Sequence, residues 1–404
     1  MRSRIERLVQ FLSQNLYERE DVIRLTLLAM FGGESIFLYG KPGLGKSFIA
    51  KAIKTIIKNG KIFEYLMNKY STPEEIFGPL DINKLSDGHY VRLIDGYLPS
   101  ADICFLDEIW KAGPSIQNTL LTIINEKEFR NGTQTIKVPL KLLIAASNEF
   151  PEENQGLEAL YDRFILRFET EPLNDFDNVL KMVGIGTDVK HELLKLNDAD
   201  LVTPENLIEI SNIVDDTNGI NFSSDTIDFI RHFKINLETK SSIYISDRRW
   251  KKTLRLMKVS ALCSDRKIVE IADTFVIKHC FWNNINNNGV DERAEIKLIY
   301  DEIVQKITGV SDDVSWAETE IKTLTNNVKG YLKNNLTNKE YIDELGIRYK
   351  SILKGLNEDN GVISKASSIF SPFDFDRASS ISSELRQEFE KTFFQLQKKV
   401  IKGS

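Results

Sequence analysis

The chain has 404 residues, of which 42% are hydrophobic and 28% are charged, and this is the ordinary composition of a globular protein. Because one core seldom covers that length, we expect two or three domains. The net charge of -6 argues against the class of nucleic-acid proteins whose affinity depends on a broad basic surface.

The sequence contains no apolar run long enough to cross a bilayer, so no membrane span is predicted. The basic start lacks the apolar stretch and the cleavage site of a signal peptide. Three cysteines, Cys104, Cys263 and Cys280, lie among apolar residues without the spacing of metal ligands, and we expect buried, reduced thiols. Together these features predict a cytoplasmic protein.

The first part of the chain alternates short apolar runs with helical patterns, which favours a parallel sheet covered by helices on both faces. Five runs are typical of buried strands: Ser35–Tyr39, Ile62–Leu66, Ile103–Leu106, Leu142–Ala146 and Phe164–Phe168. Polar residues that could take part in binding or catalysis follow several of these runs. Ligands of open α/β sheets bind at the carboxyl ends of the strands, so we expect a site at that edge.

Two insertions interrupt this pattern. Residues 128–141 predict a β-hairpin with Asn131-Gly132 as the turn pair, and residues 78–96 form a second insertion. From about Pro172 the strand signals stop and helical periodicity takes over. An asparagine-rich stretch at 283–288 is typical of a linker, and the chain beyond it is predicted to be helical throughout.

The first predicted strand is followed by a glycine-rich loop and then by a helical pattern, which is the context that a P-loop requires. The expected nucleotide contacts are Gly40, Lys41, Pro42, Gly43, Leu44, Gly45, Lys46, Ser47 and Phe48. The backbone amides of such a loop converge on phosphate oxygens next to a helix N-terminus. Lys46 would reach the β- and γ-phosphates of ATP, and the Ser47 hydroxyl would bind Mg²⁺.

Two acidic residues follow the third predicted strand. Asp107 would lie beside the metal ion, and Glu108 would polarise the attacking water. Taken alone, such a pair is equally well explained as a turn or a helix cap, but its combination with the P-loop favours the catalytic interpretation. Glu108 also favours hydrolysis over a nucleotide switch, because a switch needs only the metal site.

Further polar residues are candidates for contacts with the γ-phosphate. Asn148 follows the fourth strand and would hydrogen-bond the phosphate and the water, or else serve as a turn residue. Arg163 would act on the nucleotide of a neighbouring subunit, or else pair internally with an aspartate; Arg167 is a weaker candidate for the same role. Arg248 would lie over the phosphates, unless it belongs to a solvated arginine pair behind a helix cap.

Longer stretches carry a more specific signal than these motifs: Phe63–Met67, Ser71–Leu80, Gly96–Pro99, Leu106–Pro114, Asn125-Glu126, Phe129–Gly132, Ala145–Glu149, Leu157–Arg163 and Ser246–Trp250. Together with the P-loop they resemble the MoxR family of AAA+ ATPases, and within it the RavA (regulatory ATPase variant A) subgroup. The resemblance covers roughly residues 5 to 282.

This resemblance implies an α/β fold with a P-loop AAA+ core at residues 1–172, whose five-stranded parallel sheet has the order 5-1-4-3-2. An all-α lid carrying sensor 2 would follow at 173–282, and a C-terminal helical region at 283–404. Within the core, residues 78–96 would be the helix-two insert, and residues 128–141 would be the pre-sensor insertion.

The resemblance also implies roles for single residues. Asn148 would be sensor 1, Arg163 the arginine finger, and Arg248, in preference to Arg249, sensor 2. Tyr17 lies in the segment where the family contacts adenine. Lys46, Ser47, Asp107 and Glu108 keep the roles given above, so ATP and Mg²⁺ are the expected ligands.

MoxR proteins act as chaperone-like remodellers, commonly alongside a von Willebrand factor A (vWA) domain partner, which is ViaA for the RavA type. We therefore expect a homo-oligomer, a hexameric ring, that acts on a client protein and binds no nucleic acid. A nucleic-acid-dependent AAA+ motor and a slow ATP-dependent regulatory switch are the alternatives. RavA proteins also carry a β-rich domain that docks on a lysine decarboxylase. The sequence after residue 290 is shorter and helical, which does not favour that contact.

Overall fold

The structure is a computed structural model, and it describes residues 1–14, 16–151, 156–173, 175–182, 194–283, 291–308, 310–333, 339–358, 368–370 and 383–403. The predicted linker lies outside these ranges except for Asn283. All three cysteines are buried and free, as predicted. Among the helices that the structure describes, none combines the length and the apolar character needed to cross a membrane.

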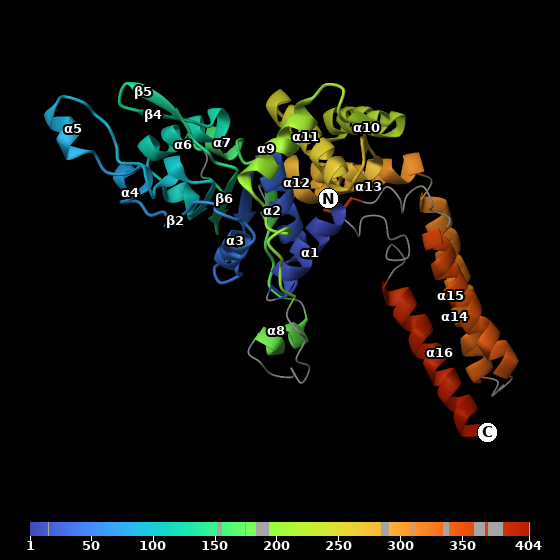
Figure 1. Cartoon of the computed structure of the whole chain (residues 1–404). Coiled ribbons are helices and arrows are strands. Elements are labelled where there is room, and N and C mark those ends of the chain that lie inside the picture. Colours follow the sequence, from blue (N-terminus) through green and yellow to red (C-terminus); the bar gives the residue numbers. More distant parts are fainter. Residues whose placement is uncertain are drawn as a thin grey trace.

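A five-stranded parallel sheet forms the centre of the first part of the molecule (Figure 1). Its strands are β1 (Ser35–Tyr39), β2 (Ile62–Leu66), β3 (Ile103–Asp107), β6 (Leu142–Ser147) and β7 (Leu166–Glu169). Their spatial order is β2-β3-β6-β1-β7, which confirms the predicted order 5-1-4-3-2.

The last strand begins two residues later than predicted. The amide of Phe164 donates to the carbonyl of Tyr161 over 3.1 Å, so this residue still belongs to the turn that ends the preceding helix. The strand starts at Leu166, once the chain has left that turn. The prediction that this apolar run is buried is therefore correct, but the predicted strand starts two residues before the observed one.

Both faces of the central strands β1, β3 and β6 are buried, which explains why these strands are almost continuously apolar, whereas the edge strand β2 is exposed at Glu64 and Leu66. Along β1, Ile36 and Leu38 pack into one hydrophobic cluster, whereas Phe37 packs into a second cluster on the opposite face. Helices α1 (Arg2–Ser13), α2 (Glu20–Gly32) and α3 (Lys46–Thr55) contribute to the first cluster. The short helices α4 (Pro73–Phe77), η1 (Leu98–Ser100), η2 (Ile109–Lys111) and α7 (Glu158–Tyr161), with α6 (Pro114–Glu126), contribute to the second.

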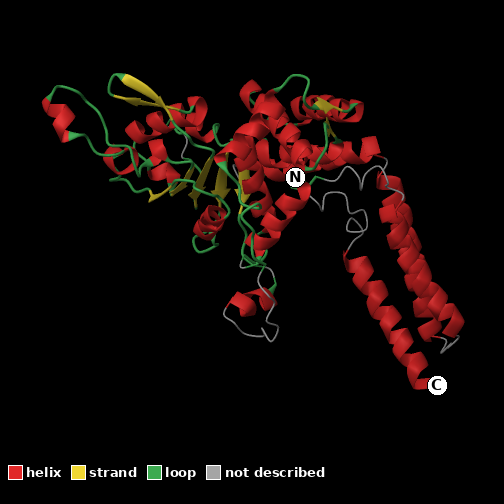
Figure 2. Cartoon of the chain, in the orientation of Figure 1, coloured by secondary structure: helices red, strands yellow, loops and turns green. Residues whose placement is uncertain are grey.

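The two insertions extend away from the sheet side by side (Figure 2). One is a hairpin of β4 (Glu128–Asn131) and β5 (Gln134–Lys137), which confirms the predicted hairpin. Its two-residue turn is Gly132-Thr133, because Asn131 pairs with Gln134 and still belongs to the ladder. Gly132 has the positive φ of 65° that this turn requires. The other insertion holds the short helix α5 (Ile82–Ser86).

The next part of the chain is mainly helical. Its helices are α8 (Phe176–Met182), α9 (Pro204–Asp215), α10 (Ser224–Lys240), α11 (Asp247–Cys263), η3 (Ile271–Val276), α12 (Ile277–Cys280) and α13 (Glu292–Thr308). Two short strands, β8 (Asn221–Phe222) and β9 (Ile268–Val269), pair in parallel here, so the lid is not all-α as the resemblance implied. Strands of two residues are too short to produce an alternating pattern in sequence.

Three long helices form a separate bundle that projects from the rest of the molecule (Figure 1). They are α14 (Val310–Lys333), α15 (Lys339–Glu358) and α16 (Ser383–Gly403). Apolar residues of these helices, including Ile321, Leu324, Val328, Leu385 and Phe389, form a hydrophobic cluster of their own. The expectation of a helical C-terminal region is thus confirmed.

Candidate functional site

The glycine-rich loop lies directly between β1 and α3, as the sequence predicts. Gly40, Gly43 and Gly45 have φ values of 151°, 82° and 84°, a range that disfavours any residue with a side chain. A Cβ on Gly40 would also lie 2.6 Å from the carbonyl oxygen of Thr170, which follows β7. The loop can therefore pack against β7 only because it is built from glycine, and its backbone curves in front of the α3 N-terminus.

Lys46, the first residue of α3, points back into this loop and is 7% exposed. Its ammonium group donates to the carbonyls of Gly40, Lys41 and Ser147, the last over 3.3 Å. Burial lowers the pKa of Lys46, and the negative charges of Asp107 and Glu108 partly oppose that effect. The charges of Asp107 and Glu108 thus lie close enough to the buried Lys46 ammonium group to act on it. Phe48 is 67% exposed beside it.

Asp107 is the last residue of β3, and Glu108 follows with a φ of 53°. This left-handed backbone turns the chain sharply, and the amide of Glu108 donates to the Asp107 carboxylate over 3.0 Å. The Glu108 carboxylate lies 3.2 Å from the ammonium of Lys111. The two acids therefore have different partners, a backbone amide for Asp107 and an ammonium group for Glu108, which suits two separate tasks.

Asn148 comes directly after β6, the strand between β1 and β3, and its side chain is exposed. The strand register pairs Ala146 with Asp107 and Ser147 with Tyr39. Neighbouring strands lie about 4.8 Å apart. Asn148 therefore lies between the strand ends that carry the loop and the acids.

Arg163 follows α7, and its guanidinium donates to the carbonyl of Ala159 over 3.0 Å. Its contact with Asp162 is long, at 3.9 Å. Asp162 is bound instead by the buried Arg249 of α11, over 3.0 Å. The internal pair considered as the alternative for Arg163 is therefore weak, because another arginine holds the aspartate.

Arg248 and Arg249 at the start of α11 have different surroundings. Arg249 is buried and also donates to the side chain of Asn283 over 2.7 Å, while burial lowers its pKa to about 9. Arg248 is exposed. Burial of Arg163 is the main cause that lowers the pKa of Arg163, and the positive charge of Arg248 lowers it further. These two arginines therefore lie near each other. Ser246 caps α11 by accepting from the Arg249 amide, as the alternative predicted, but Arg249 is buried, so the two arginines are not the solvated pair of that alternative.

Arg167 cannot act on a neighbouring subunit, and this weaker candidate for the finger was wrong. The side chain is 0% exposed, and its guanidinium lies 3.8 Å from the centre of the Tyr161 ring. It donates to the carbonyls of Phe164, Tyr161 and Trp282. A buried arginine of this kind is stabilised by carbonyls and a ring face that the sequence does not reveal.

The segment that contains Tyr17 reaches the glycine-rich loop through its neighbour Arg19. That guanidinium donates to the carbonyls of Leu44 in the loop, over 3.4 Å, and of Glu171 after β7, over 2.8 Å. A cavity of about 700 Å³ opens beside this contact. It is lined by residues that the sequence did not single out, among them Glu169, Lys278, His279, Trp282 and Arg293.

The two insertions are joined to each other by a polar contact, here named the insert clasp. The Asn131 side chain accepts from the amide of Arg92 over 2.7 Å and donates to the carbonyl of the same residue over 3.0 Å. A groove of about 530 Å³ lies between the insertions. Large apolar side chains are exposed on the first of them: Ile82, Leu85, Tyr90 and Leu93.

The donors at the sheet edge fit a nucleoside triphosphate with a magnesium ion. A curved loop of amides and a buried lysine suit phosphate oxygens. Magnesium in such sites is held by one or two protein oxygens, water and phosphate, which Ser47 and Asp107 satisfy. The described residues contain no group of three or more His, Cys, Asp or Glu side chains that could hold a metal without such a ligand.

Comparisons with known proteins agree with this geometry. The family described as the MoxR domain in MoxR-vWA-beta-propeller ternary systems matches residues 3–212 (the MoxR part), and the AAA lid domain matches residues 225–294 (the lid part). A crystal structure of a candidate ATPase from Cytophaga hutchinsonii is similar in fold, with a TM-score of 0.57 and 20% identity. The similarity covers 74% of this chain and 93% of the Cytophaga chain.

Sequence relatives extend over much of the chain. An uncharacterised protein of Methanocaldococcus jannaschii is 33% identical over 361 residues, which are 89% of either chain. A second one from that organism is 35% identical over 285 residues, covering 70% of this chain and 71% of the relative. A structural protein of Acidianus two-tailed virus is 34% identical over 169 residues, covering 41% of this chain and 27% of the viral protein.

Proposed function

This chain belongs to the MoxR family of AAA+ ATPases, and on that premise we propose that it hydrolyses ATP with Mg²⁺ between subunits of a ring and uses the turnover to remodel or assemble a partner protein. The main support is the carboxyl edge of the sheet, where β1, β3 and β6 bring Lys46, Asp107 and Asn148 together. Phosphoryl transfer needs positioning and charge stabilisation, and these residue types supply both.

Each residue at this edge then has one task. The loop amides and Lys46 bind the phosphates, while Ser47 and Asp107 hold the magnesium ion. Glu108 orients and polarises the attacking water once its carboxylate has left Lys111 and contacts the water instead. Asn148 bonds the γ-phosphate, and the exposed Arg248 reaches the phosphates from the lid part. The buried Arg249 supports the contact between the parts instead.

Arg163 supplies the arginine finger for the nucleotide of an adjacent subunit. In the single chain it is held by one carbonyl and by a long contact to an aspartate that Arg249 occupies. These contacts are weak enough for the guanidinium to swing outward when a neighbour presents a phosphate. Hydrolysis would then depend on assembly.

The description of the matched family supports a vWA-domain protein as partner and a β-propeller protein as a third component. We expect a hexameric ring with chaperone-like activity. Membership of the RavA subgroup, a ViaA-like partner and a cytoplasmic location remain predictions from the sequence. The nucleic-acid alternative gains no support from the hairpin, where Lys137 pairs with Glu128 over 2.5 Å.

A mixing experiment tests the shared site. Arg163→Ala subunits should bind ATP with nearly normal affinity but lose turnover by about 10³-fold, the usual worth of an arginine finger. Lys46→Ala subunits should fail to bind ATP. A mixture of the two should regain activity, because the intact loop of one subunit meets Arg163 of the other.

The control is Arg231→Ala, which removes an exposed arginine from α10 and should leave turnover unchanged. If the mixture stays inactive, or if Arg163→Ala alone keeps full activity at every protein concentration, the shared site is wrong. Co-purification of a vWA-domain protein with Glu108→Gln in ATP, and its loss with Lys46→Ala, tests the partner separately.

A further inference from the structure

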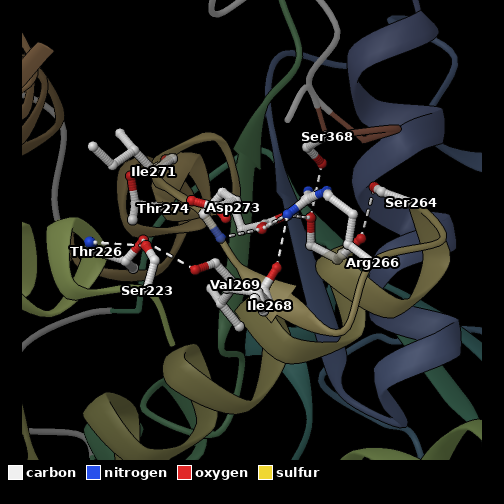
Figure 3. Close-up of polar contacts among 12 residues, drawn as sticks. Ser223, Thr226, Ser264, Arg266, Ile268, Val269, Ile271, Asp273, Thr274 and Ser368 are labelled. Carbon is white, nitrogen blue, oxygen red and sulfur yellow. Dashed lines mark hydrogen bonds and ion pairs between the residues drawn. The ribbon is translucent and has the colours of Figure 1, made fainter. Parts of the chain in front are cut away.

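A short segment of the C-terminal region, Ser368–Phe370, lies apart from the bundle of α14–α16. Ser368, Ile369 and Phe370 are 0%, 1% and 3% exposed. Ile369 and Phe370 belong to the large hydrophobic cluster of the MoxR and lid parts, whereas the bundle has a cluster of its own. Figure 3 shows Ser368 close to Ser264, Arg266 and Asp273 of the lid part. Three residues of the C-terminal region are thus built into another core.

The polar groups of α11 face this segment as hydrogen-bond acceptors. The buried Asp273 carboxylate is held by Arg266 over 2.7 and 2.8 Å, and it accepts from the Ser260 hydroxyl over 2.6 Å. Because a carboxylate paired with arginine only accepts, the Ser260 hydrogen is committed to Asp273. Ser260 therefore offers a lone pair to Ser368, whose hydroxyl lies 2.8 Å away and must donate.

A second serine, Ser264, follows the last residue of α11 and is committed in the same way. Ser264 donates its hydroxyl hydrogen to the carbonyl of Ser260 over 2.7 Å, and it accepts from the amide of Ile369 over 3.0 Å. The segment supplies a matching hydroxyl and amide donor at the correct spacing. A proline at 369 or an alanine at 368 could not replace them.

The carbonyl of Ile369 faces the other way. It accepts from the guanidinium of Arg24, a buried residue of α2 that is also held by Glu20 over 2.6 Å. One residue therefore bonds to the lid part through its amide and to the MoxR part through its carbonyl. The Phe370 ring lies 6.3 Å from the Phe31 ring at the end of α2, which adds an apolar contact on the MoxR side.

We propose that the cleft between α2 and α11 is a docking site for a Ser-Ile-Phe segment, and that residues 368–370 of the same chain occupy it as an anchor. The anchor fastens the C-terminal region to the MoxR and lid parts at once. The cleft selects a hydroxyl donor, an amide donor and an aromatic side chain in that order. It shares no residue with the nucleotide site.

A disulfide tests where the segment lies. The Ser260 and Ser368 oxygens are 2.8 Å apart, so the Ser260→Cys/Ser368→Cys double variant should form an intrachain disulfide on mild oxidation of the native full chain. The product should be 2 Da lighter and should migrate faster without reductant (~2 Da for two hydrogens lost). Each single variant should show neither change. Failure of the double variant to cross-link would overturn the docking, and disulfide-linked dimers would assign the segment to another copy and overturn the intrachain anchor.

Stability measurements test what the segment contributes. Ser368→Ala should raise the unfolding equilibrium constant about fivefold, and Ser260→Ala should raise it further because it also loses the bond to Asp273. The double variant should raise it by less than the product of the two, because both single variants already lose the bond between the two hydroxyls. Phe370→Ala should lower the melting temperature by about 5–10 °C. Phe394→Ala removes an equal ring that is 56% exposed on α16, and it should leave the melting temperature unchanged. Independent serine effects together with a Phe370→Ala variant as stable as the wild type would overturn the proposal.

Discussion

The nucleotide edge and the α2–α11 cleft are both polar clusters flanked by the MoxR part and the lid part, but they differ in how their groups are used. At the nucleotide edge, Asn148 and Arg248 are exposed and Lys46 shares its protons among loop carbonyls. In the cleft, the hydroxyls of Ser260 and Ser264 and the carboxylate of Asp273 are bonded within the chain.

This difference separates a site kept ready for a ligand from a site that holds the fold together. Exposed polar groups that act on a ligand contribute little to stability, so their removal should change activity alone. Polar groups that bond each other inside a core should do the reverse, because each loss leaves a buried partner unsatisfied. Variants in the two clusters should therefore separate cleanly into two classes.

The largest expected effect lies at the nucleotide edge. Glu108→Gln should lower kcat by about 10²–10⁴-fold, because the amide cannot accept a proton from the attacking water. ATP affinity and the free energy of unfolding should stay close to those of the wild type. Steady-state hydrolysis, nucleotide titration and urea unfolding measure the three quantities. Glu149→Gln, an exposed acid next to Asn148, is the control; an equal loss there would remove Glu108 from the chemistry.

In the cleft, Asp273→Asn should lower the free energy of unfolding by about 3 kcal/mol, because it leaves Arg266 without its buried partner. Urea unfolding measures the loss. Asp265→Asn removes an acid that is 55% exposed and binds the N-terminus, so it should cost less than about 0.5 kcal/mol. Equal stability of Asp273→Asn and the wild type would place the cleft in the ligand-directed class.

The adjacent arginines of α11 sharpen the comparison, because they belong to different classes one residue apart. Arg249→Ala should lower the free energy of unfolding by about 2 kcal/mol through the loss of its bonds to Asp162 and Asn283. Arg248→Ala should leave stability unchanged and lower kcat by about tenfold, the worth of one charge-assisted hydrogen bond. Reversed results would make Arg249 the sensor.

The smallest expected effect concerns the insert clasp. Asn131→Ala removes both bonds to the Arg92 backbone and should lower the free energy of unfolding by about 1 kcal/mol. Hydrogen exchange at residues 78–96 should rise in this variant. Thr133→Ala changes an exposed residue of the same turn and should alter neither quantity. Unchanged exchange in Asn131→Ala would show that the insertions are held together by other contacts.

Local signals predicted the sheet and the glycine-rich loop. Strands covered on both faces are continuous apolar runs, and a loop of glycines between strand and helix has one common use. The positions of Asp107 and Asn148 followed from the rule that parallel strands bring their carboxyl ends to one edge. None of these inferences needed a contact between residues distant in sequence.

The predictions that failed all depended on contacts between residues distant in sequence. Arg167 was misassigned because its partners include Trp282, 115 residues away. The anchor was missed because Ser368 meets Ser260 across 108 residues and Ile369 meets Arg24 across 345. A stretch such as Ser-Ile-Phe carries no periodicity, and two serines spaced by four at the end of a helix are unremarkable until the acceptors of their hydroxyl hydrogens are known.

One glycine limits how the outer end of this protein can be re-engineered. A Cβ on Gly132 would lie 2.7 Å from the carbonyl oxygen of Tyr90, where the first insertion crosses the hairpin turn. The side chains of α5 are not buried, so we expect foreign sequences to be tolerated in this stretch. Position 132 has no such tolerance, because any larger residue would push the first insertion away from the hairpin turn.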